Sequence, residues 1–160
     1  MRGDFHTHST LDDGKSSLEE MAAAARAAGL THFGFSGHSY CPLEEDYCIP
    51  REKLPEYLAR ARAVQAQYTG EMEVFVGLEL DLLGERPEGL DYAIGSVHTI
   101  CGGDGRHFAV DESPETARQC VEELFGGDWY RYTDAYYDQV ALLPERTGCD
   151  WIGHFDLVTK

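Results

Sequence analysis

Residues 4–14 carry side chains that are able to bind a metal ion. His6 and His8 stand two positions apart, so in an extended segment both imidazoles point to the same side and can hold one ion. Asp13 follows five residues after His8, beside Gly14, where a turn of the backbone can return a hard oxygen ligand to the same place. The pattern predicts a metal site at a strand end. For an isolated His-x-His, an ordinary polar junction between strand and loop is the alternative.

The rest of the chain alternates between short apolar runs and segments with helical periodicity. The runs predict strands at 2–6, 32–36, 72–82, 92–97 and 150–154. The periodic segments predict helices at 17–28, 53–68, 113–125 and 128–143. The glycine-rich segment 101–111 is expected to be a loop. Strands that alternate with helices indicate an α/β fold with a parallel sheet or barrel.

Each of the five predicted strands ends in a candidate ligand. In chain order these are His6 and His8, His38, Glu79, His98 and His154. Because the carboxyl ends of parallel strands share one face of an α/β fold, these side chains are expected to meet there. A group rich in histidine and carboxylate, without thiolate, suits zinc, iron or manganese. Closely spaced ions of this kind favour hydrolysis of a phosphate monoester, with a hydroxide shared between the ions as the nucleophile.

Composition narrows the class of protein. A chain of 160 residues fits a single domain, 1–160. The net charge of −16 opposes binding to nucleic acids and to anionic membranes, so a small molecule is the expected partner. No apolar run is long enough to span a bilayer, and the N-terminus lacks the apolar segment of a signal peptide, which predicts a cytoplasmic protein. Five cysteines without a Cys-x-x-Cys predict reduced thiols, and the oligomeric state stays open.

The candidate ligands lie in short motifs that resemble, in order and spacing, the polymerase and histidinol phosphatase (PHP) family of metal-dependent phosphoesterases. The motifs are His6-Thr7-His8, Asp13-Gly14, Ser36-Gly37-His38, Gly77-Leu78-Glu79, Gly95-Ser96-Val97-His98 and Gly153-His154-Phe155-Asp156. The resemblance implies a distorted (β/α)7 TIM-like barrel, present here as about its first five strands. It also implies two or three divalent ions, zinc, iron or manganese, at the carboxyl ends of the strands.

The resemblance also assigns roles to single residues. It implies that a first ion is held by His6 and His8, that Glu79 bridges it to a second ion held by His98 and His154, and that a third ion is held by Asp13 and His38. Glu79, His98 and His154 are the residues expected at the reacting centre. Asp12 is the rival of Asp13, whose place before Gly14 fits the family spacing better. Gly37 stands where many members have an Asp, a mild departure.

A larger departure lies at the C-terminus. Family members complete the site with an Asp-x-His that is absent before Lys160, so we expect the chain to be the N-terminal part of a longer enzyme. Five strands would leave an open barrel with unpaired edges. A natural short protein is the alternative.

The motifs around His98 and His154 resemble the histidinol-phosphatase branch most. This implies hydrolysis of L-histidinol phosphate to L-histidinol and phosphate in histidine biosynthesis. Lys160 and Arg106 are candidates for binding the phosphate group, although each is also readily explained as a surface charge. Two other functions stay open: a PHP phosphoesterase for another small phosphate ester or a nucleotide, and an inactive metal-binding fragment.

Overall fold

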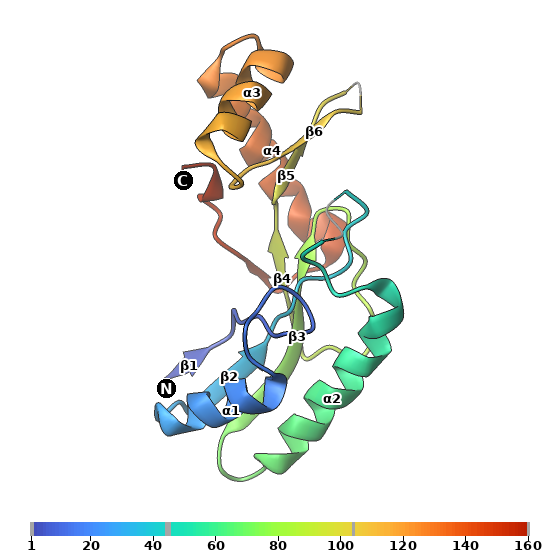
Figure 1. Cartoon of the computed structure of the whole chain (residues 1–160), viewed down its shortest axis with the longest axis vertical. Helices are drawn as coiled ribbons and strands as arrows, with labels where there is room; N and C mark the ends of the chain where they lie inside the picture. The colour runs from blue at the N-terminus through green and yellow to red at the C-terminus, as the bar shows by residue number, and fades with distance from the viewer. Residues whose placement is uncertain (1, 44–45, 104, 160) are drawn as a thin grey trace.

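A parallel β-sheet forms the centre of the molecule. The computed structural model describes residues 2–43, 46–103 and 105–159. Within them five strands lie in the order β1-β2-β3-β4-β7, and every neighbouring pair is parallel. The strands are β1 Gly3–Asp4, β2 His32–Phe35, β3 Glu73–Asp81, β4 Tyr92–Ser96 and β7 Trp151–Ile152. The sheet is curled like part of a barrel wall, which confirms the predicted α/β class (Figure 1).

Helices connect the strands and cover the sheet. They are α1 Leu18–Ala27, α2 Leu54–Gln67, α3 Pro114–Phe125 and α4 Trp129–Thr147, with short 3-10 turns at Arg51–Lys53 and Leu157–Thr159. α1 and α2 lie beside β2 and β3 at the end of the molecule that holds the N-terminus, whereas α3 and α4 lie at the opposite end (Figure 1). Among the described residues, no helix is both long and apolar enough to cross a bilayer.

The first helix begins where the sequence predicts it. The Ser17 side chain accepts a hydrogen bond from the Glu20 backbone N–H, and the Glu20 carboxylate accepts one from the Ser17 backbone N–H. This reciprocal cap satisfies donors that the first turn would otherwise leave free, and it fixes the point at which the chain leaves the site loop. The buried face of α1 carries Leu18, Ala22 and Ala25.

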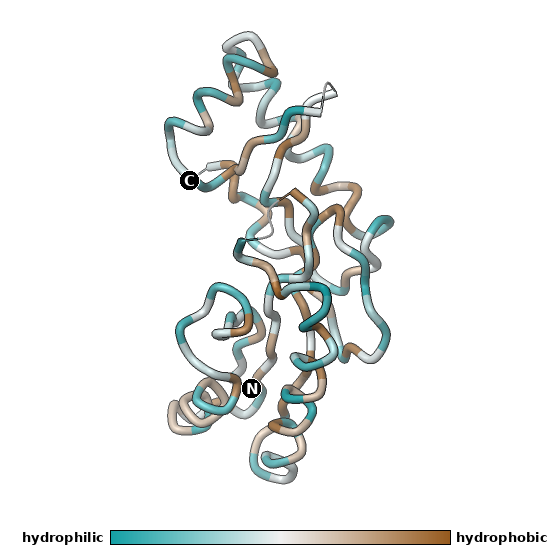
Figure 2. Tube along the Cα trace, turned by 45° about the vertical axis from the view of Figure 1, so that its right-hand side comes forward, coloured by the Kyte–Doolittle hydropathy of each residue, from teal (hydrophilic) through white to brown (hydrophobic). Residues whose placement is uncertain are grey.

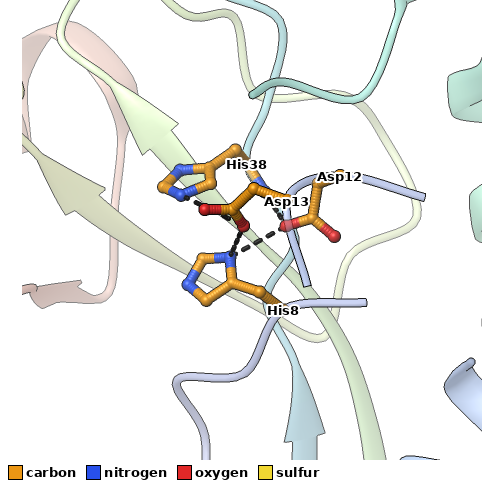
Figure 3. A group of neighbouring side chains, drawn as sticks. All are labelled: His8, Asp12, Asp13 and His38. Carbon is orange, nitrogen blue, oxygen red and sulfur yellow. Dashed lines mark hydrogen bonds and ion pairs between the residues drawn. The ribbon is translucent and has the colours of Figure 1, made fainter. Parts of the chain in front are cut away.

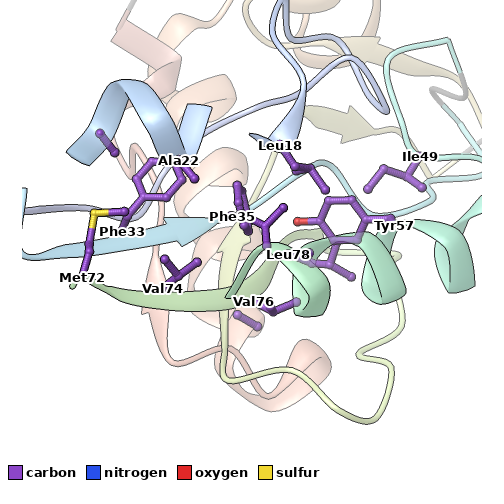
Figure 4. Packing of buried hydrophobic residues seen from close by; sticks show 14 of the residues in the cluster. Leu18, Ala22, Phe33, Phe35, Ile49, Tyr57, Met72, Val74, Val76 and Leu78 are labelled. Atoms are coloured by element: carbon purple, nitrogen blue, oxygen red, sulfur yellow. The ribbon is translucent and has the colours of Figure 1, made fainter. Parts of the chain in front are cut away.

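Apolar side chains from the sheet and its helices form two clusters. The larger joins α1 and α2 to β2 and β3, with Phe35, Tyr57 and Leu78 fully buried at its centre (Figure 4). The second joins α3 and α4 to the segment that follows β4, and includes Tyr136 and Leu143. Figure 2 shows hydrophobic and hydrophilic residues alternating along the helices, as expected when one helix face is buried. The clusters give the strand ends a rigid base.

Two expectations about local structure were wrong. The segment 101–111, expected as a loop, takes part in a two-stranded antiparallel hairpin of β5 Thr99–Cys101 and β6 His107–Ala109. α4 continues past Leu143 through Pro144 and ends at Gly148, which adopts a left-handed conformation with φ of 62°. Beyond the proline, the last turn is closed by the Thr147 hydroxyl, which donates to the Leu143 carbonyl, and by the Gly148 N–H, which donates to the Pro144 carbonyl.

Candidate metal centre

The carboxylate of Glu79 is the centre of the candidate site. Glu79 lies near the carboxyl end of β3 and is only 1% exposed. Five histidines surround it, each with a ring nitrogen close to one of its oxygens. The shortest distances are 2.9 Å from His154 Nε2, 3.0 Å from His6 Nε2, 3.2 Å from His38 Nδ1, and 3.5 Å from both His8 Nε2 and His98 Nε2. The five predicted histidine positions and Glu79 therefore meet at one point.

Thr7 explains why His6 and His8 both face this point. The Thr7 backbone N–H donates to Ser36 Oγ at 2.7 Å, and the Thr7 hydroxyl donates to the Gly34 carbonyl at 2.8 Å. These bonds hold Thr7 against β2. Because alternate residues of an extended chain point to opposite sides, the two flanking imidazoles turn toward Glu79.

His38 reaches the site because parallel pairing continues beyond the end of β2. The Glu79 N–H donates to the Gly37 carbonyl at 3.1 Å, and the Ser39 N–H donates to the Glu79 carbonyl at 2.8 Å. His38 thus sits beside Glu79 on the neighbouring strand. Gly37 fits here because a side chain would collide with Ile49 and would crowd the Asp12 carboxylate.

His98 and His154 come from the other half of the sheet. β4 ends at Ser96, two residues before His98, and β7 is extended by a hydrogen bond from the Gly153 N–H to the Gly95 carbonyl at 3.0 Å, just before His154. The Ser96 hydroxyl donates to Glu79 Oε1 at 2.5 Å. This contact fixes the rotamer of the glutamate from β4 and leaves the second carboxylate oxygen facing His6, His8 and His38.

The two neighbouring aspartates of the first loop have different environments (Figure 3). The Asp12 side chain is fully buried and lies 2.8 Å from His8 Nδ1. The Asp13 side chain is 48% exposed, and its Oδ1 lies 3.5 Å from His8 Nδ1 and 3.9 Å from His38 Nε2. The structure therefore brings Asp13 to the place predicted for it, between His8 and His38. It also reveals Asp12 as a closer hydrogen-bonding partner of His8 than the sequence indicated.

The donor atoms fit bound cations. Three groups of residues offer ligand atoms within 4.8 Å of one another: His6 with Glu79 and His154, His38 with Glu79 and His98, and His8 with Asp12, Asp13 and His38. Within the described parts of the chain, Glu79 Oε2, His98 Nδ1 and His154 Nδ1 are buried and have no hydrogen-bond partner. Buried polar atoms of this kind are costly unless something satisfies them. A bound cation would satisfy the glutamate oxygen, and the histidine and carboxylate set is one that zinc, iron or manganese accepts.

Close contact between one buried carboxylate and several imidazoles shifts the pKa values at the centre. Burial alone would raise the pKa of Glu79, but the imidazoles of His154, His6 and His98 hold that pKa far below its usual range. Burial lowers the pKa of His38 to about 4, so this ring stays neutral and keeps a free lone pair. Burial would also lower the pKa of His98, but Asp81 and Glu79 raise it to about 10. Glu79 is therefore ionised in the ion-free site, and a metal ion bound at His98 would displace the proton of that ring.

A cavity of about 260 Å³ opens above these ligands. Besides the ligands predicted from the sequence, it is lined by Tyr47, Ala109, Asp111 and Leu157. Sequence reasoning missed these four as site residues. Ala109 and Asp111 reach the cavity because β6 runs back along β5 and the Val110 N–H donates to the His98 carbonyl at 2.7 Å, and no local motif marks this hairpin. The cavity is large enough for a small phosphate ester.

Arg106, one of the two candidates for phosphate binding, does not join this group. Arg106 Nη1 lies 2.7 Å from Glu123 Oε2, so its guanidinium is bound to α3, and Arg106 does not line the cavity. Lys160 lies outside the described residues. Its role in phosphate binding stays a prediction.

A curled parallel sheet with histidines and a buried glutamate at its carboxyl ends defines the class: an α/β protein of the TIM-like barrel type, with side-chain clusters that could bind metal ions. The chain belongs to the PHP domain family, whose model matches residues 4–160. This confirms the family that the motifs indicated.

Similar proteins support the same assignment. A protein of Deinococcus radiodurans named "Probable histidinol-phosphatase" is 34% identical over 172 aligned positions, covering 98% of this chain and 61% of the relative. The DNA polymerase/3'-5' exonuclease PolX of Bacillus subtilis is 32% identical over 93 positions, covering 58% of this chain and 15% of PolX. A crystal structure of a Listeria monocytogenes protein described as "putative histidinol phosphatase hisK" matches 98% of this chain and 68% of that chain, with a TM-score of 0.77 at 18% identity. The chain thus spans about three fifths of its curated relative.

Proposed function

We propose that the chain forms the metal centre of a phosphomonoesterase that hydrolyses L-histidinol phosphate to L-histidinol and phosphate. One observation carries the proposal: a single buried glutamate lies within 3.5 Å of ring nitrogens from five histidines, in a member of the PHP family. A carboxylate offers about four lone-pair sites, so hydrogen bonding alone does not explain five imidazoles around Glu79. Histidine and carboxylate together are a ligand set for divalent ions, which does explain them.

The family resemblance assigns the residues that would hold the ions. His6 and His8 would bind a first ion with Glu79, His98 and His154 would bind a second with the same carboxylate, and Asp13 and His38 would bind a third. The donor groups of the structure divide the same residues differently, with His6 beside His154, His38 beside His98, and His8 beside Asp13 and His38. When bound, closely spaced divalent ions lower the pKa of coordinated water and neutralise charge on phosphoryl oxygens. We propose that the site binds two or three divalent ions and that these ions are zinc, iron or manganese.

The chain's own residues prepare the site for a small anionic ester. Burial of Glu79 under Ser96 removes water from the base of the cavity, so charges within it interact more strongly than they would in solvent. Asp111, two residues after the end of β6, places a carboxylate in the cavity lining. We expect it to face the cationic part of the substrate, since L-histidinol phosphate carries an amine.

The proposal has two candidate substrates. The name of the Deinococcus relative supports histidinol phosphate, whereas the partial likeness to PolX supports a nucleotide as the second candidate. The net charge of −16 disfavours nucleic acid itself, and a cytoplasmic location stays a prediction. Rates of phosphate release from L-histidinol phosphate, a nucleoside monophosphate and p-nitrophenyl phosphate, each with added Zn²⁺, Mn²⁺ or Fe²⁺, separate the candidates. A nucleotide preference would replace the first candidate with the second.

Glu79→Gln tests the enzymatic role. We expect loss of more than about 100-fold in phosphate release, because the change removes a direct ligand and even partners of ligands are worth 10–100-fold. Glu73→Gln, at the exposed start of the same strand, is the matched control and should retain activity. Bound metal without phosphate release in the unaltered chain would instead support a metal-binding module. Undiminished activity of Glu79→Gln would remove the bridging role.

A further inference from the structure

Asp12 is a buried carboxylate with a full set of hydrogen-bond donors around it. Its Oδ2 lies 2.8 Å from His8 Nδ1 and accepts the backbone N–H of His38 at 3.1 Å. Its Oδ1 accepts the backbone N–H of Ser9 at 2.8 Å and the Ser9 hydroxyl at 3.1 Å. Four donors occupy the four lone-pair directions that a carboxylate offers. Asp12 therefore has little capacity left for a cation.

We propose that Asp12 is a positioning residue that fixes the tautomer of His8. An ionised carboxylate only accepts hydrogen bonds, so the proton of the neutral His8 ring must sit on Nδ1. The free lone pair is then on Nε2, the nitrogen that lies 3.5 Å from Glu79 Oε2. The inference rests on the proposed role of His8 as a metal ligand, and it assigns the ligand atom.

Asp12 also connects the loop after β1 with the loop after β2. The same oxygen that holds His8 accepts the His38 backbone N–H, so a single atom fixes the relative position of the two histidines. Their rings stack with centroids 4.3 Å apart. Asp13 differs in this respect, because among the described residues it accepts no hydrogen bond and half of its side chain is open to solvent. We infer a division of labour in which Asp13 is the ligand and Asp12 holds His8 and His38.

The tautomer of His8 can be measured directly in the whole chain. With ¹⁵N-labelled histidine, long-range ¹H–¹⁵N correlation spectra taken above the pKa of His8 distinguish a protonated Nδ1 from a protonated Nε2, and the signal of His8 is the one lost in His8→Gln. We expect the Nδ1–H form in the metal-free protein. On addition of Zn²⁺, Nε2 should shift while Nδ1 keeps its proton. A proton on Nε2, or zinc on Nδ1, overturns the proposal.

A pair of variants separates the two aspartates. Asp12→Asn offers one oxygen and one N–H₂ where two oxygens now accept, so we expect a mixed or inverted His8 tautomer and Zn²⁺ affinity lower by about 10–100-fold. Asp13→Asn should weaken Zn²⁺ binding and leave the tautomer unchanged. An unchanged tautomer in a folded Asp12→Asn variant contradicts the inference. If circular dichroism shows that Asp12→Asn does not fold, the unaltered chain and Asp13→Asn decide.

The test of the role of Asp12 does not depend on which substrate the protein uses. A chain with the expected tautomer but no phosphatase activity refutes the proposed function and leaves the role of Asp12 intact. A chain that releases phosphate but carries the other tautomer refutes only the role of Asp12.

Discussion

Tyr92 shows how one side chain beneath the site controls the ligands above it. Its hydroxyl, on β4, lies 2.7 Å from the Phe5 carbonyl and 2.9 Å from the Phe35 carbonyl, next to His6 and just before the His38 loop. The ring has room because Gly34 and Gly77 carry no side chain. A Cβ at either position would lie within 2.6 Å of the Tyr92 ring or hydroxyl. β1 pairs with β2 through only two residues, so this hydroxyl is a main constraint on its carboxyl end.

Tyr92→Phe should therefore destabilise the chain by about 1–2 kcal/mol, because it leaves a partly buried carbonyl without its donor. The free energy of unfolding in urea measures the effect. Tyr130→Phe, at a tyrosine that is 85% exposed, is the control and should change stability by less than about 0.5 kcal/mol. Equal stability of the two variants would show that the hydroxyl does not hold β1.

The sequence predicted where some residues of the site lie and missed others. The positions of His6, His8, His38, Glu79, His98 and His154 were predictable because each follows or ends a strand, and parallel strand ends converge. Their role as metal ligands stays a prediction. Tyr47 and Asp111 were not predictable as cavity residues, because they approach through loop and hairpin geometry that leaves no periodic signal.

At the level of elements, Asp91 links a helix to the strand that carries Glu79. Its carboxylate accepts from Arg62 Nη1 at 2.7 Å and from Gln65 Nε2 at 3.0 Å, both on α2, and from the Val76 N–H of β3 at 2.8 Å. Burial alone would raise the pKa of Asp91, but Arg62 and the Val76 N–H lower it below its usual value. The contacts hold α2 against the middle of β3.

The stability that Asp91 contributes should depend on pH. Since its folded pKa lies below its unfolded pKa of about 3.9, the contribution is complete above pH ~4 and is lost as pH falls through the folded pKa. Asp91→Asn should cost about 1–2 kcal/mol near pH 7 and progressively less below pH ~4. Urea unfolding across this pH range measures the difference, with Asp134→Asn on the exposed side of α4 as control. A cost independent of pH would contradict the ionic account.

The end of α4 offers a test of backbone conformation alone. Gly148 has φ of 62°, and an added Cβ would meet no atom within 4 Å, so the penalty of Gly148→Ala is purely conformational. We expect a loss of about 1–2 kcal/mol in the free energy of unfolding. Gly103→Ala also enters open space, but without a left-handed φ, and should be nearly neutral. A neutral Gly148→Ala would mean that α4 can end in another way.

The elements themselves were largely predictable, and the exceptions have local causes. The helices with caps, such as α1 and α3, begin within a residue or two of the predicted position because Ser17 and Ser113 are recognisable N-caps. The β5–β6 hairpin was missed because its strands have three residues each, too short for an alternating pattern. The end of α4 was placed too early because Pro144 normally marks a stop.

At the level of the whole molecule, metal binding should raise the free energy of unfolding and the Tm. At about 100 times its Kd, a metal that binds only the folded chain adds about 2.7 kcal/mol, which raises the Tm of a chain of this size by roughly 5–10 °C. Thermal unfolding with Zn²⁺ or Mn²⁺, and again after addition of a chelator, measures this shift. The Glu79→Gln variant should show a smaller shift. Equal shifts in both proteins would place the bound metal elsewhere.

The order of strands in the sheet has a consequence for how the protein is made. The first and last histidines of the cluster follow the outermost strands, β1 and β7, so His6 and His154 are separated by 148 positions in the chain. A ribosome adding about 5–20 residues per second needs roughly 7–30 s to cover that distance. During this time the earlier ligands are already synthesised but lack the partners that would close the cluster. Loading of the complete cluster must therefore follow translation of nearly the whole segment, and a nascent chain stalled before β7 would carry only part of it.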